Sequence, residues 1–519
     1  MPSASWRRPD RSPASSSPAA AWAGCRSIDR REFLERAAGV ALGAGAVGAL
    51  SGFRFEAAAG PFRELAREIQ GTVVTPSSAA YARDKVLVDG RFDGEHPQAI
   101  VYCESADDVE RTVRWAQKHA IHIVPRCGGH SYAGYSTTNK GVVVDVSRMN
   151  RMHMHGGIAT VGAGARLIDV YGGLTPLGLT IPAGSCPTVG IAGLALGGGV
   201  GYAGRKLGLT CDNLVGLSLV TAQGKLLECG PHENGDLFWA SCGGGGGNFG
   251  IVTSFRFRTH HVGDVAYYQV VWPWFDAARA TRAWQAFAPH APDELFSTLY
   301  MSTAGARGPG TVPFVSSGGQ YFGSETDLRS LIAPLVSTGT PTRVTVGTLT
   351  YIDAIMHWAA CHPIEQCQVV PHARFKSRSD YVNTPLSNAA IGTLLAGMEA
   401  TQASTSLGSA ALIFDASGGA INRVHVADTA FVHRNALFSI QYYSGWVGAG
   451  AGDLHWNRSL YAAMRPYVSG FAYQNYIDPD LESWKHAYYG SNLGRLSTVK
   501  RKHDPQNVFH FAQSIPTRL

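Results

Sequence analysis

Three observations in the sequence predict an α+β protein of two domains. At 519 residues the chain is too long for one compact core. Its 61 glycines gather in loops that follow short apolar stretches, where a ligand can approach the backbone closely. From about residue 263 these loops give way to alternating polar and apolar stretches, which predict a second domain built on an antiparallel β-sheet flanked by helices.

Residues 1–60 have the pattern of an export signal followed by a linker. The adjacent Arg30 and Arg31 precede a mild apolar stretch from Ala37 to Leu50, and small residues follow it. Paired arginines before such a stretch are typical of the twin-arginine route, which exports folded proteins. The apolar stretch is shorter than the roughly 20 residues that span a bilayer. We therefore expect a secreted protein that meets the twin-arginine machinery transiently and has no stable membrane insertion.

The composition argues against a disordered chain and against a nucleic-acid partner. Hydrophobic residues make up 45% of the chain and charged residues 16%, as in globular proteins. The formal charge is +6, but the first 60 residues account for half of it, with eight Arg against five Asp or Glu. No basic stripe with interleaved aromatic residues is visible. We expect no nucleic acid among the partners.

The first domain, predicted over residues 61–262, begins as an alternation of strands and a helix. Residues 99–103 predict a strand, and Ser105 with Asp108 forms a capping box that opens a helix to about residue 119. Further strands are predicted at residues 121–125, 141–146 and 158–161.

The second domain, predicted over residues 263–463, contains a strand at 437–443 with one polar face and a helix at 388–400. Residues 464–519 form a C-terminal segment that we expect to return to the first domain. Helical spacing there covers residues 484–502, and Asp504-Pro505 ends it.

Three glycine-dense loops in the first domain indicate a large, phosphate-bearing ligand. They cover residues 125–136, 181–201 and 243–253, and backbone N–H groups in such loops can hold a pyrophosphate. Gly199-x-Gly201-x-x-Gly204 satisfies the dinucleotide fingerprint as a string. However, no clear strand-to-helix turn carries it and no acidic residue stands about 20 positions further on, so we reject an NAD-binding fold.

The nine cysteines leave two structural questions open. Cys361 and Cys367 are close enough in sequence for a small-loop disulfide in an oxidising compartment. A zinc site at Cys361, His362 and Cys367 lacks a second pair of ligands. We expect no metal.

The loops resemble those of berberine-bridge-enzyme-like oxidases in the vanillyl-alcohol-oxidase flavoprotein superfamily. The resemblance covers roughly residues 75–519, and it is most specific in 97–257 and 471–515. The matching elements are Arg126–Ser131, Gly184–Gly190, Asp236–Ala240 leading into Gly243–Thr253, Tyr473-x-Asn475-Tyr476-x-Asp478, Tyr488-Tyr489-Gly490-x-Asn492, and Asp504-Pro505-x-Asn507-x-Phe509. The twin-arginine start is similar to bacterial members of the aclacinomycin-oxidoreductase type, and oligosaccharide oxidases are further relatives. The resemblance implies a PCMH-type FAD-binding fold.

The resemblance also implies FAD attached through two covalent bonds. His130 matches the histidine that bonds the flavin 8α-methyl carbon, and Cys186 matches the cysteine that bonds C6. Taken alone, His130 is a loop histidine bonded to backbone and Cys186 a small buried hydrophobe; their placement in successive glycine loops is what makes them specific. The remaining cofactor-binding residues that we expect are Arg126, Cys127, Gly128, Gly129, Ser131, Gly134, Gly190, Gly193, Gly197, Gly198, Gly201, Gly247, Asn248, Gly250, Val252, Gln441 and Asn475.

Three tyrosines are the catalytic candidates that the resemblance implies. Tyr476 matches the family's catalytic base, which requires a nearby donor or cation to stabilise its phenolate. Tyr473 could support it, and Tyr381 resembles a second active-site tyrosine from the substrate domain. Strand alternation places Gln441 toward the flavin. The sequence departs from many relatives at Ala240-Ser241-Cys242, which lacks an arginine found there. We therefore expect either a contact to a cofactor phosphate or a packing contact to differ, with neither covalent anchor affected.

The predicted reaction is oxidation of an alcohol, on a sugar or glycosylated metabolite, by hydride transfer to FAD with dioxygen as the electron acceptor and hydrogen peroxide as product. One alternative is oxidative cyclisation or amine oxidation of an aromatic natural product. Another is a flavin-loaded carrier without turnover. The substrate itself cannot be read from the sequence, because the pocket lies in the divergent second domain.

Overall fold

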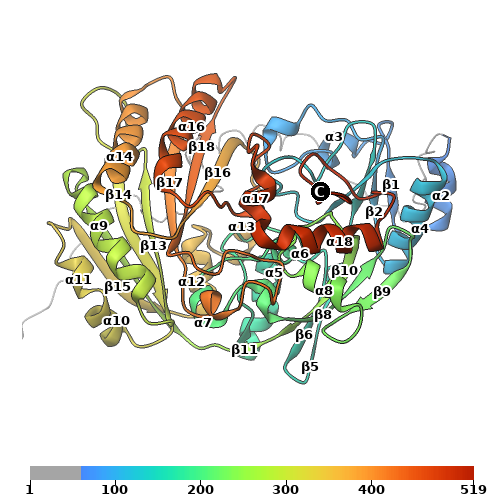
Figure 1. The fold of residues 1–519 in the computed structure, drawn as a ribbon, viewed down its shortest axis with the longest axis horizontal. Helices are drawn as coiled ribbons and strands as arrows, with labels where there is room; N and C mark the ends of the chain where they lie inside the picture. The colour runs from blue at the N-terminus through green and yellow to red at the C-terminus, as the bar shows by residue number, and fades with distance from the viewer. Residues whose placement is uncertain (1–59) are drawn as a thin grey trace, which may run out of the picture.

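The computed structural model describes residues 60–519, and the predicted export signal therefore lies outside the described residues, apart from Gly60. Two small sheets belong to the N-terminal part and one large sheet to the middle of the chain (Figure 1). A short pair, β7 (Leu179–Thr180) with β11 (His260–His261), completes the set. The fold is α+β, as predicted.

The N-terminal part holds a mixed sheet and an antiparallel one. The first has four strands in the order β1 (Thr72–Val74), β2 (Ala99–Tyr102), β4 (Val142–Asp145) and β3 (Ile123–Arg126), of which β2, β4 and β3 are parallel. The second is wholly antiparallel, in the order β5 (Met152–His155), β6 (Ile158–Gly162), β10 (Ile251–Arg258), β8 (Leu214–Val220) and β9 (Leu226–Cys229). The glycine-rich loops leave β3, β7 and helix α8, and thus meet at one side of these sheets.

Short helices connect these strands. They are α2 (Phe62–Glu68), α3 (Tyr81–Asp84), α4 (Ala106–Lys118), α5 (Leu167–Leu174), α6 (Ile191–Leu196), α7 (Gly204–Leu207) and α8 (Gly235–Ser241). The predicted capping box at α4 is half correct. The Ser105 hydroxyl accepts from the Asp108 N–H at 3.2 Å, but the Asp108 carboxylate accepts from the N–H groups of Gln70, Gly71 and Glu104 instead of Ser105. It thereby ties the chain before β1 to the start of α4.

The middle of the chain forms a seven-stranded antiparallel sheet. Its order is β15 (Arg343–Leu349), β12 (Val265–Trp272), β14 (Phe314–Tyr321), β13 (Leu295–Ser302), β17 (Ser409–Ala416), β18 (Phe438–Trp446) and β16 (Arg374–Val382). Its helices are α9 (Ala277–Phe287), α10 (Glu325–Leu331), α11 (Ala333–Val336), α12 (Tyr351–Trp358), α13 (Ile364–Cys367), α14 (Asn388–Ala403), α15 (Ala420–Arg423) and α16 (Ala451–Met464).

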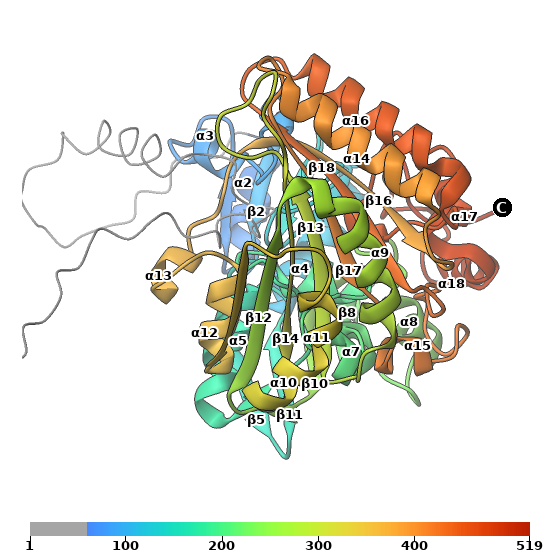
Figure 2. The same ribbon diagram turned by 90° about the vertical axis from the view of Figure 1, so that its left-hand side faces the viewer.

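Both faces of this sheet are buried along β13, β16 and β18, but with different chemistry, whereas the edge strand β15 is largely accessible. Helices α9, α14 and α16 cover one face (Figure 2), where Trp284 packs edge-on against Phe414 and Phe438. The other face, with Gln441 on β18, meets the N-terminal part, since the Gln441 amide donates to the Tyr132 hydroxyl. The polar side predicted for residues 437–443 therefore faces a ligand cavity and not bulk water.

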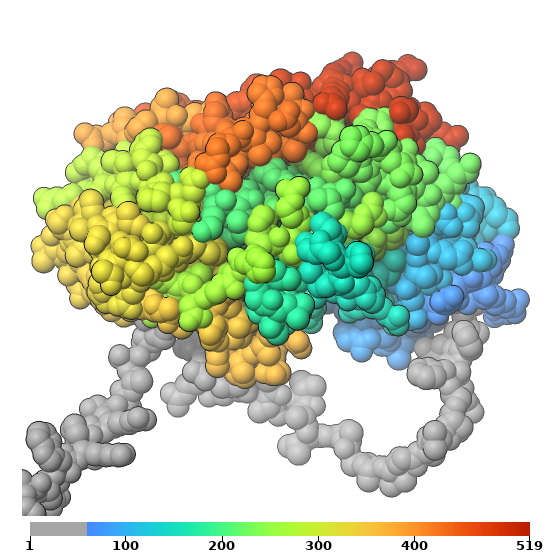
Figure 3. Space-filling model, turned by 90° about the horizontal axis from the view of Figure 1, so that it is seen from below, coloured from blue at the N-terminus to red at the C-terminus, as the bar shows by residue number. Residues whose placement is uncertain are grey.

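The C-terminal residues cross back to the N-terminal part, where they lie against its green segments at the far end from the yellow ones (Figure 3). The single helix predicted over residues 484–502 is wrong in detail. It is two helices, α17 (Trp484–Tyr489) and α18 (Leu493–His503), separated at Gly490. Gly490 has φ +44°, outside the right-handed helical region, and interrupts the helix there.

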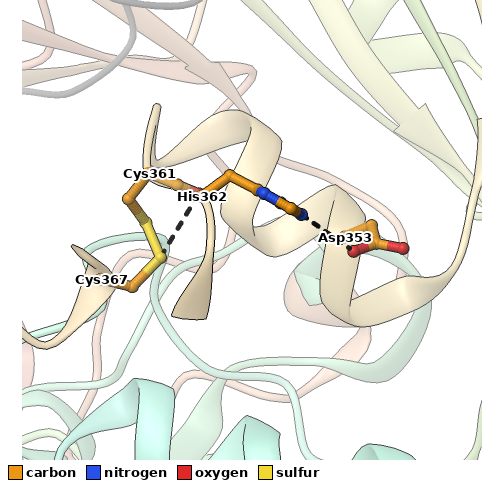
Figure 4. Close-up of a disulfide and its surroundings, with 4 residues drawn as sticks. All are labelled: Asp353, Cys361, His362 and Cys367. Carbon is orange, nitrogen blue, oxygen red and sulfur yellow. Dashed lines mark hydrogen bonds and ion pairs between the residues drawn. A yellow bond between two sulfur atoms is a disulfide. The ribbon is translucent and has the colours of Figure 1, made fainter. Parts of the chain in front are cut away.

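Cys361 and Cys367 form a disulfide around α13 (Figure 4), with their Cα atoms 5.2 Å apart. This answers one question that the sequence left open, because bonded sulfurs cannot serve as zinc ligands. Within residues 60–519 no group of three or more metal-ligating side chains is arranged to hold an ion. In the same range, no helix has the length and apolarity needed to cross a bilayer.

Candidate active site

A cavity of about 310 Å³ lies between the glycine-rich loops, the polar face of the large sheet and the C-terminal segment. The three loops supply most of its wall as backbone and small side chains. The sheet contributes side chains from one face of β16, β17 and β18, and the C-terminal segment contributes residues 473–477. The site is therefore assembled from three stretches that are far apart in the sequence.

The first loop carries His130 into this cavity. Burial lowers the pKa of its imidazole to about 4, so the ring is neutral at physiological pH. Its Nε2 lies 2.9 Å from the Thr188 hydroxyl on the second loop. Gly128 allows the two loops to touch, because a Cβ there would lie 2.5 Å from the backbone nitrogen of Gly190. The loop thus presents a neutral imidazole that Thr188 holds in one orientation.

The first loop also supplies a buried cation. Arg126 is 6% exposed and its Nε pairs with Asp145. Its Nη1 is buried and has no hydrogen-bond partner among the described residues, and Arg126 lines the cavity. A buried guanidinium N–H is costly to leave unpaired, so this geometry suits an anionic group such as the pyrophosphate of a dinucleotide.

Two cysteines line the cavity, and their surroundings differ. Cys186, on the second loop, is half-buried and is not in a disulfide. The Cys127 thiol instead donates to the carbonyl of Ala163 at 3.0 Å, and burial raises its pKa to about 12. A Cβ on Gly190 would lie 2.1 Å from the Cys127 sulfur, so this thiol is wedged against backbone. Cys127 is therefore held as an inert thiol.

The C-terminal segment holds the third glycine loop in place. The Asn248 amide donates to the carbonyls of Gly244 and Gly245, while its oxygen accepts from the Ile515 N–H at 2.8 Å. The Lys500 ammonium donates to the Asn248 carbonyl at 2.7 Å. These bonds explain why glycines and an asparagine occur together here, since the loop is shaped by bonds to its own backbone.

Tyr473, Asn475 and Tyr476 stand side by side in the same segment. The Tyr473 hydroxyl accepts from the Gly199 N–H and from the Asn475 amide, each at 2.9 Å, so it is engaged in holding the second loop. Tyr476 lines the cavity and stacks on Tyr132 with ring centroids 5.4 Å apart. Burial raises the pKa of Tyr476 well above its ordinary value.

The large sheet closes the cavity with Gln441 and Asp415. The Gln441 amide donates to the Ser377 hydroxyl at 2.8 Å and to the Tyr132 hydroxyl at 3.2 Å. Asp415, on β17, lines the cavity, and burial raises the pKa of its carboxyl to about 7. Aromatic rings of Phe375 and Tyr443 stand beside them.

Most of the residues expected at the site lie on the cavity wall. These are His130, Cys186, Arg126, Cys127, Gly128, Gly129, Ser131, Gly190, Gly193, Gly247, Asn248, Gly250, Val252, Gln441, Tyr473, Asn475 and Tyr476. Four glycines do not line it, namely Gly134, Gly197, Gly198 and Gly201. At Gly197 a Cβ would lie 1.9 Å from the Asn475 amide oxygen, so this glycine admits the side chain that shapes the wall. The four act through packing between loops.

Tyr381 lies behind the cavity wall. It is 3% exposed, stacks on His433 with centroids 4.3 Å apart, and meets the Tyr473 ring at 6.5 Å. Its catalytic role stays a prediction, and the geometry offers it contact with Tyr473 and not with a ligand.

Some cavity-lining or contacting residues were not predicted from the sequence, namely Asp415, Tyr132, Thr188 and the aromatic Phe375 and Tyr443. A lone acid in the apolar stretch 409–416 was a usable signal for Asp415.

Comparisons with known proteins agree with this geometry. Residues 97–230 match the family described as FAD binding domain, and residues 472–516 the family described as berberine and berberine like. The FAD-linked oxidoreductase YgaK of Bacillus subtilis is 34% identical over 86% of this chain and 97% of its own length. Chitooligosaccharide oxidase of Gibberella zeae is 30% identical over 81% of this chain and 87% of its own.

Solved structures give the same result. The berberine-bridge-enzyme-like protein 1 of Physcomitrella patens has a TM-score of 0.82 at 34% identity, covering 89% of this chain and all of its own. Phl p 4, a grass pollen allergen with glucose dehydrogenase activity, has a TM-score of 0.78 at 27% identity, covering 88% of this chain and 99% of its own.

Proposed function

Because the chain belongs to the berberine-bridge-enzyme-like family of FAD-linked oxidoreductases, we propose that it oxidises a hydroxyl group of a sugar, an oligosaccharide or a glycosylated metabolite. We propose further that FAD is held by two covalent bonds, to His130 and Cys186, and that dioxygen takes up the electrons as hydrogen peroxide. The observation that carries the proposal is one cavity lined by both nucleophiles and, from other stretches of the chain, by Tyr476 and Gln441.

The residues present fit a flavin dinucleotide. Backbone of three glycine loops lines the cavity, and the buried Nη1 of Arg126 suits a pyrophosphate. His130 is neutral, as a nucleophile must be, and its Nε2 is occupied by Thr188, which leaves Nδ1 for bonding. When bound, FAD supplies the two-electron acceptor, and covalent attachment would raise its potential and prevent its loss outside the cell.

Single and double variants test the two bonds. His130→Ala and Cys186→Ala should each keep flavin bound after acid denaturation, through the remaining bond, whereas the double variant should release it. Cys127→Ser is the matched control, a second cavity thiol that should leave both bonds intact. Peptide mass spectrometry reads the attachment sites directly. Flavin released fully from the wild type by acid would contradict the covalent proposal.

The substrate class rests on relatives and on the cavity wall. Relatives include a chitooligosaccharide oxidase and a glucose dehydrogenase. Near the polar Gln441 and Asp415, the cavity carries the aromatic rings of Tyr132, Phe375 and Tyr443. Apolar ring faces beside a few fixed polar groups suit a sugar, which presents both C–H faces and hydroxyls.

Anaerobic flavin reduction by a panel of sugars, oligosaccharides and glycosylated metabolites tests this class. At least one sugar should bleach the flavin, and product analysis should find a carbonyl or lactone. A new ring in the product would instead indicate oxidative cyclisation, and failure of every compound would indicate a carrier. Readmitting air should restore the oxidised spectrum with one peroxide per turnover. Slow reoxidation by air together with fast reoxidation by an artificial acceptor would identify a dehydrogenase.

Tyr476 is proposed to contact the reacting hydroxyl, as the family resemblance implies. Tyr476→Phe keeps the stacking on Tyr132 and removes only the hydroxyl. It should lower the limiting rate of flavin reduction by about 10²-fold, within the range for one positioned acid–base group, while leaving flavin content unchanged. An unchanged rate would remove Tyr476 from the reaction.

Export through the twin-arginine route is also proposed, from residues outside the described range. The Cys361–Cys367 disulfide supports it, because disulfides persist in oxidising compartments. Replacing Arg30 and Arg31 together by Lys should retain the protein inside the cell, and mass analysis of the secreted wild type should show loss of the first residues. Secretion that survives the double replacement would argue against this route.

A further inference from the structure

Tyr202 is a cavity-lining tyrosine that the proposed function does not use. It stands at the end of the second glycine loop, between α6 and α7, and its side chain is 6% exposed. Gly201, directly before it, packs on the neighbouring backbone, because a Cβ there would overlap the carbonyl oxygen of Ala183. The loop therefore fixes the backbone that carries Tyr202.

Aromatic side chains from the second domain support the Tyr202 ring. The ring stacks on Trp358 with centroids 5.1 Å apart and an interplanar angle of 19°, and it meets Phe296 of β13 edge-on at 5.4 Å. Trp358 is the last residue of α12, and the Cys361–Cys367 disulfide follows that helix. Packing from two elements thus holds the tyrosine in one orientation at the cavity wall.

The Tyr202 hydroxyl has no hydrogen-bond partner within residues 60–519. In contrast, the Tyr132 hydroxyl accepts from the Gln441 amide, and the Tyr473 hydroxyl accepts from the Gly199 N–H. Burial raises the pKa of Tyr202 well above its ordinary value, so its phenol stays protonated. A buried donor without a partner is costly, and one that lines a ligand cavity can recover this cost by donating to the ligand.

Tyr202 and Tyr476 border the same part of the cavity from different walls. After burial, the charges of Asp415 and Cys186 raise the pKa of Tyr202, and the same two groups contribute to the raised pKa of Tyr476. Both phenols therefore lie near these groups. Tyr476 stacks on Tyr132 of the first loop, whereas Tyr202 is supported by the second domain. A substrate between these walls meets two phenols at once.

We propose that Tyr202 determines specificity by donating a hydrogen bond to a second hydroxyl of the substrate, beside the hydroxyl that is oxidised. The proposal rests on the alcohol oxidation proposed above, in which Tyr476 contacts the reacting hydroxyl. Because both phenols border the space next to Asp415 and Cys186, the two hydroxyls must be close neighbours in one molecule. Adjacent carbons of a sugar ring carry such a pair. The site therefore selects a vicinal diol over a simple alcohol, which would leave the Tyr202 donor unpaired.

Deleting a hydroxyl from the enzyme and from the sugar tests this hydrogen bond as a double-mutant cycle. The probe is the sugar that reduces the flavin fastest in the panel above, compared with its monodeoxy analogue that lacks the hydroxyl beside the oxidised carbon. For glucose oxidised at C1, this analogue is 2-deoxyglucose. The measurement is the second-order rate constant of anaerobic flavin reduction on the flavin-loaded enzyme.

The expected result is a loss that depends on the sugar. In the wild type the rate constant should be about tenfold lower for the analogue than for the parent sugar, the size expected for one neutral hydrogen bond. Tyr202→Phe keeps the stacking on Trp358 and removes only the hydroxyl. It should lower the rate constant about tenfold for the parent sugar and by less than about twofold for the analogue.

Tyr267→Phe is the matched control. Tyr267 belongs to the same aromatic group, meets Trp358 edge-on with centroids 6.3 Å apart, and does not line the cavity. Removing its hydroxyl should leave both rate constants unchanged. Where Tyr202→Phe fails to load flavin, Trp358→Phe replaces it, since a smaller ring holds Tyr202 less firmly. That variant should narrow the difference between the two sugars.

Equal losses for the two sugars in Tyr202→Phe would overturn the proposal, because a purely structural tyrosine does not distinguish them. A wild type that reacts equally fast with both sugars would also overturn it. The same holds for a Trp358→Phe variant, used in place of Tyr202→Phe, that keeps the full wild-type difference. A wild type that no sugar reduces counts instead against the proposed function, and that failure appears without any comparison between sugars.

Discussion

Replacing Lys500 by Met removes one half of a wholly buried ion pair. Lys500 and Asp504 lie one turn apart at the end of α18, and both side chains are 0% exposed. The ammonium donates to the Asp504 carboxylate and to the carbonyls of Asn248 and Phe509. Asp504 in turn accepts from the N–H groups of Val508 and Phe509. The pair therefore joins the C-terminal segment to the third glycine loop.

The expected cost of Lys500→Met is about 3–5 kcal/mol of unfolding free energy. Met matches the length of the Lys stem, so packing is kept, but Asp504 is left as an uncompensated buried charge. A domain is stable by about 5–15 kcal/mol, so this loss is a large fraction of the total. Urea unfolding followed by tryptophan fluorescence measures it.

Lys502→Met is the matched control on the same helix. Lys502 pairs with Asp236, but its side chain is 64% exposed, so its loss should cost about 0–1 kcal/mol. Lys500→Met combined with Asp504→Asn should recover part of the loss, since no charge remains buried. The reasoning fails if Lys500→Met costs no more than Lys502→Met, or if the double variant is no more stable than the single one.

Two further predictions concern the disulfide and a buried histidine. Replacing Cys361 and Cys367 together by Ser removes a cross-link between residues with a sequence separation of 6, which should lower the free energy of unfolding by about 2 kcal/mol. Thermal unfolding measures this loss as a lower midpoint temperature. Adding a reductant to the wild type should lower its midpoint to the same temperature. The buried His433 has its pKa lowered to about 3. Below about pH 6.5 the histidine of the unfolded chain is protonated, whereas the buried His433 of the folded protein stays neutral. The free energy of unfolding should therefore fall by up to about 1.4 kcal/mol per pH unit between about pH 6.5 and pH 3. His433→Phe should make this fall less steep, and equal slopes in the two proteins would contradict the prediction.

Much of the site could be predicted from the sequence because its chemistry is local. Glycines are needed wherever the backbone must approach a ligand closely. They occur beside both proposed anchors, as Gly128 and Gly129 beside His130 and as Gly184 beside Cys186, so the sequence itself indicates the loops. The N-cap at Ser105 was predictable for the same reason, since its partner Asp108 is three residues away. Short-range requirements of this kind determine the strands, the loops and the FAD-binding family.

What the polar face of residues 437–443 contacts could not be predicted from local sequence. The alternation correctly placed Gln441 opposite Ile440, yet it could not say whether the polar side met water or another part of the chain. Likewise the break at Gly490 depends on how α17 and α18 dock separately, and helical spacing runs across it. Spacing reports on which side a residue lies and not on what lies beyond that side.

The sequence by itself therefore determined the class of protein and the two nucleophiles proposed to hold the cofactor. Only the tertiary structure decided the surroundings of the tyrosines, because those surroundings come from strands and segments distant in the chain. It placed Asp415 on the same cavity as Tyr476, buried the tyrosine so that its pKa is raised well above the ordinary value, and placed Tyr381 behind the wall. The protonation state of a buried group depends on every neighbour within a few ångströms, and the chain brings those neighbours together only by folding.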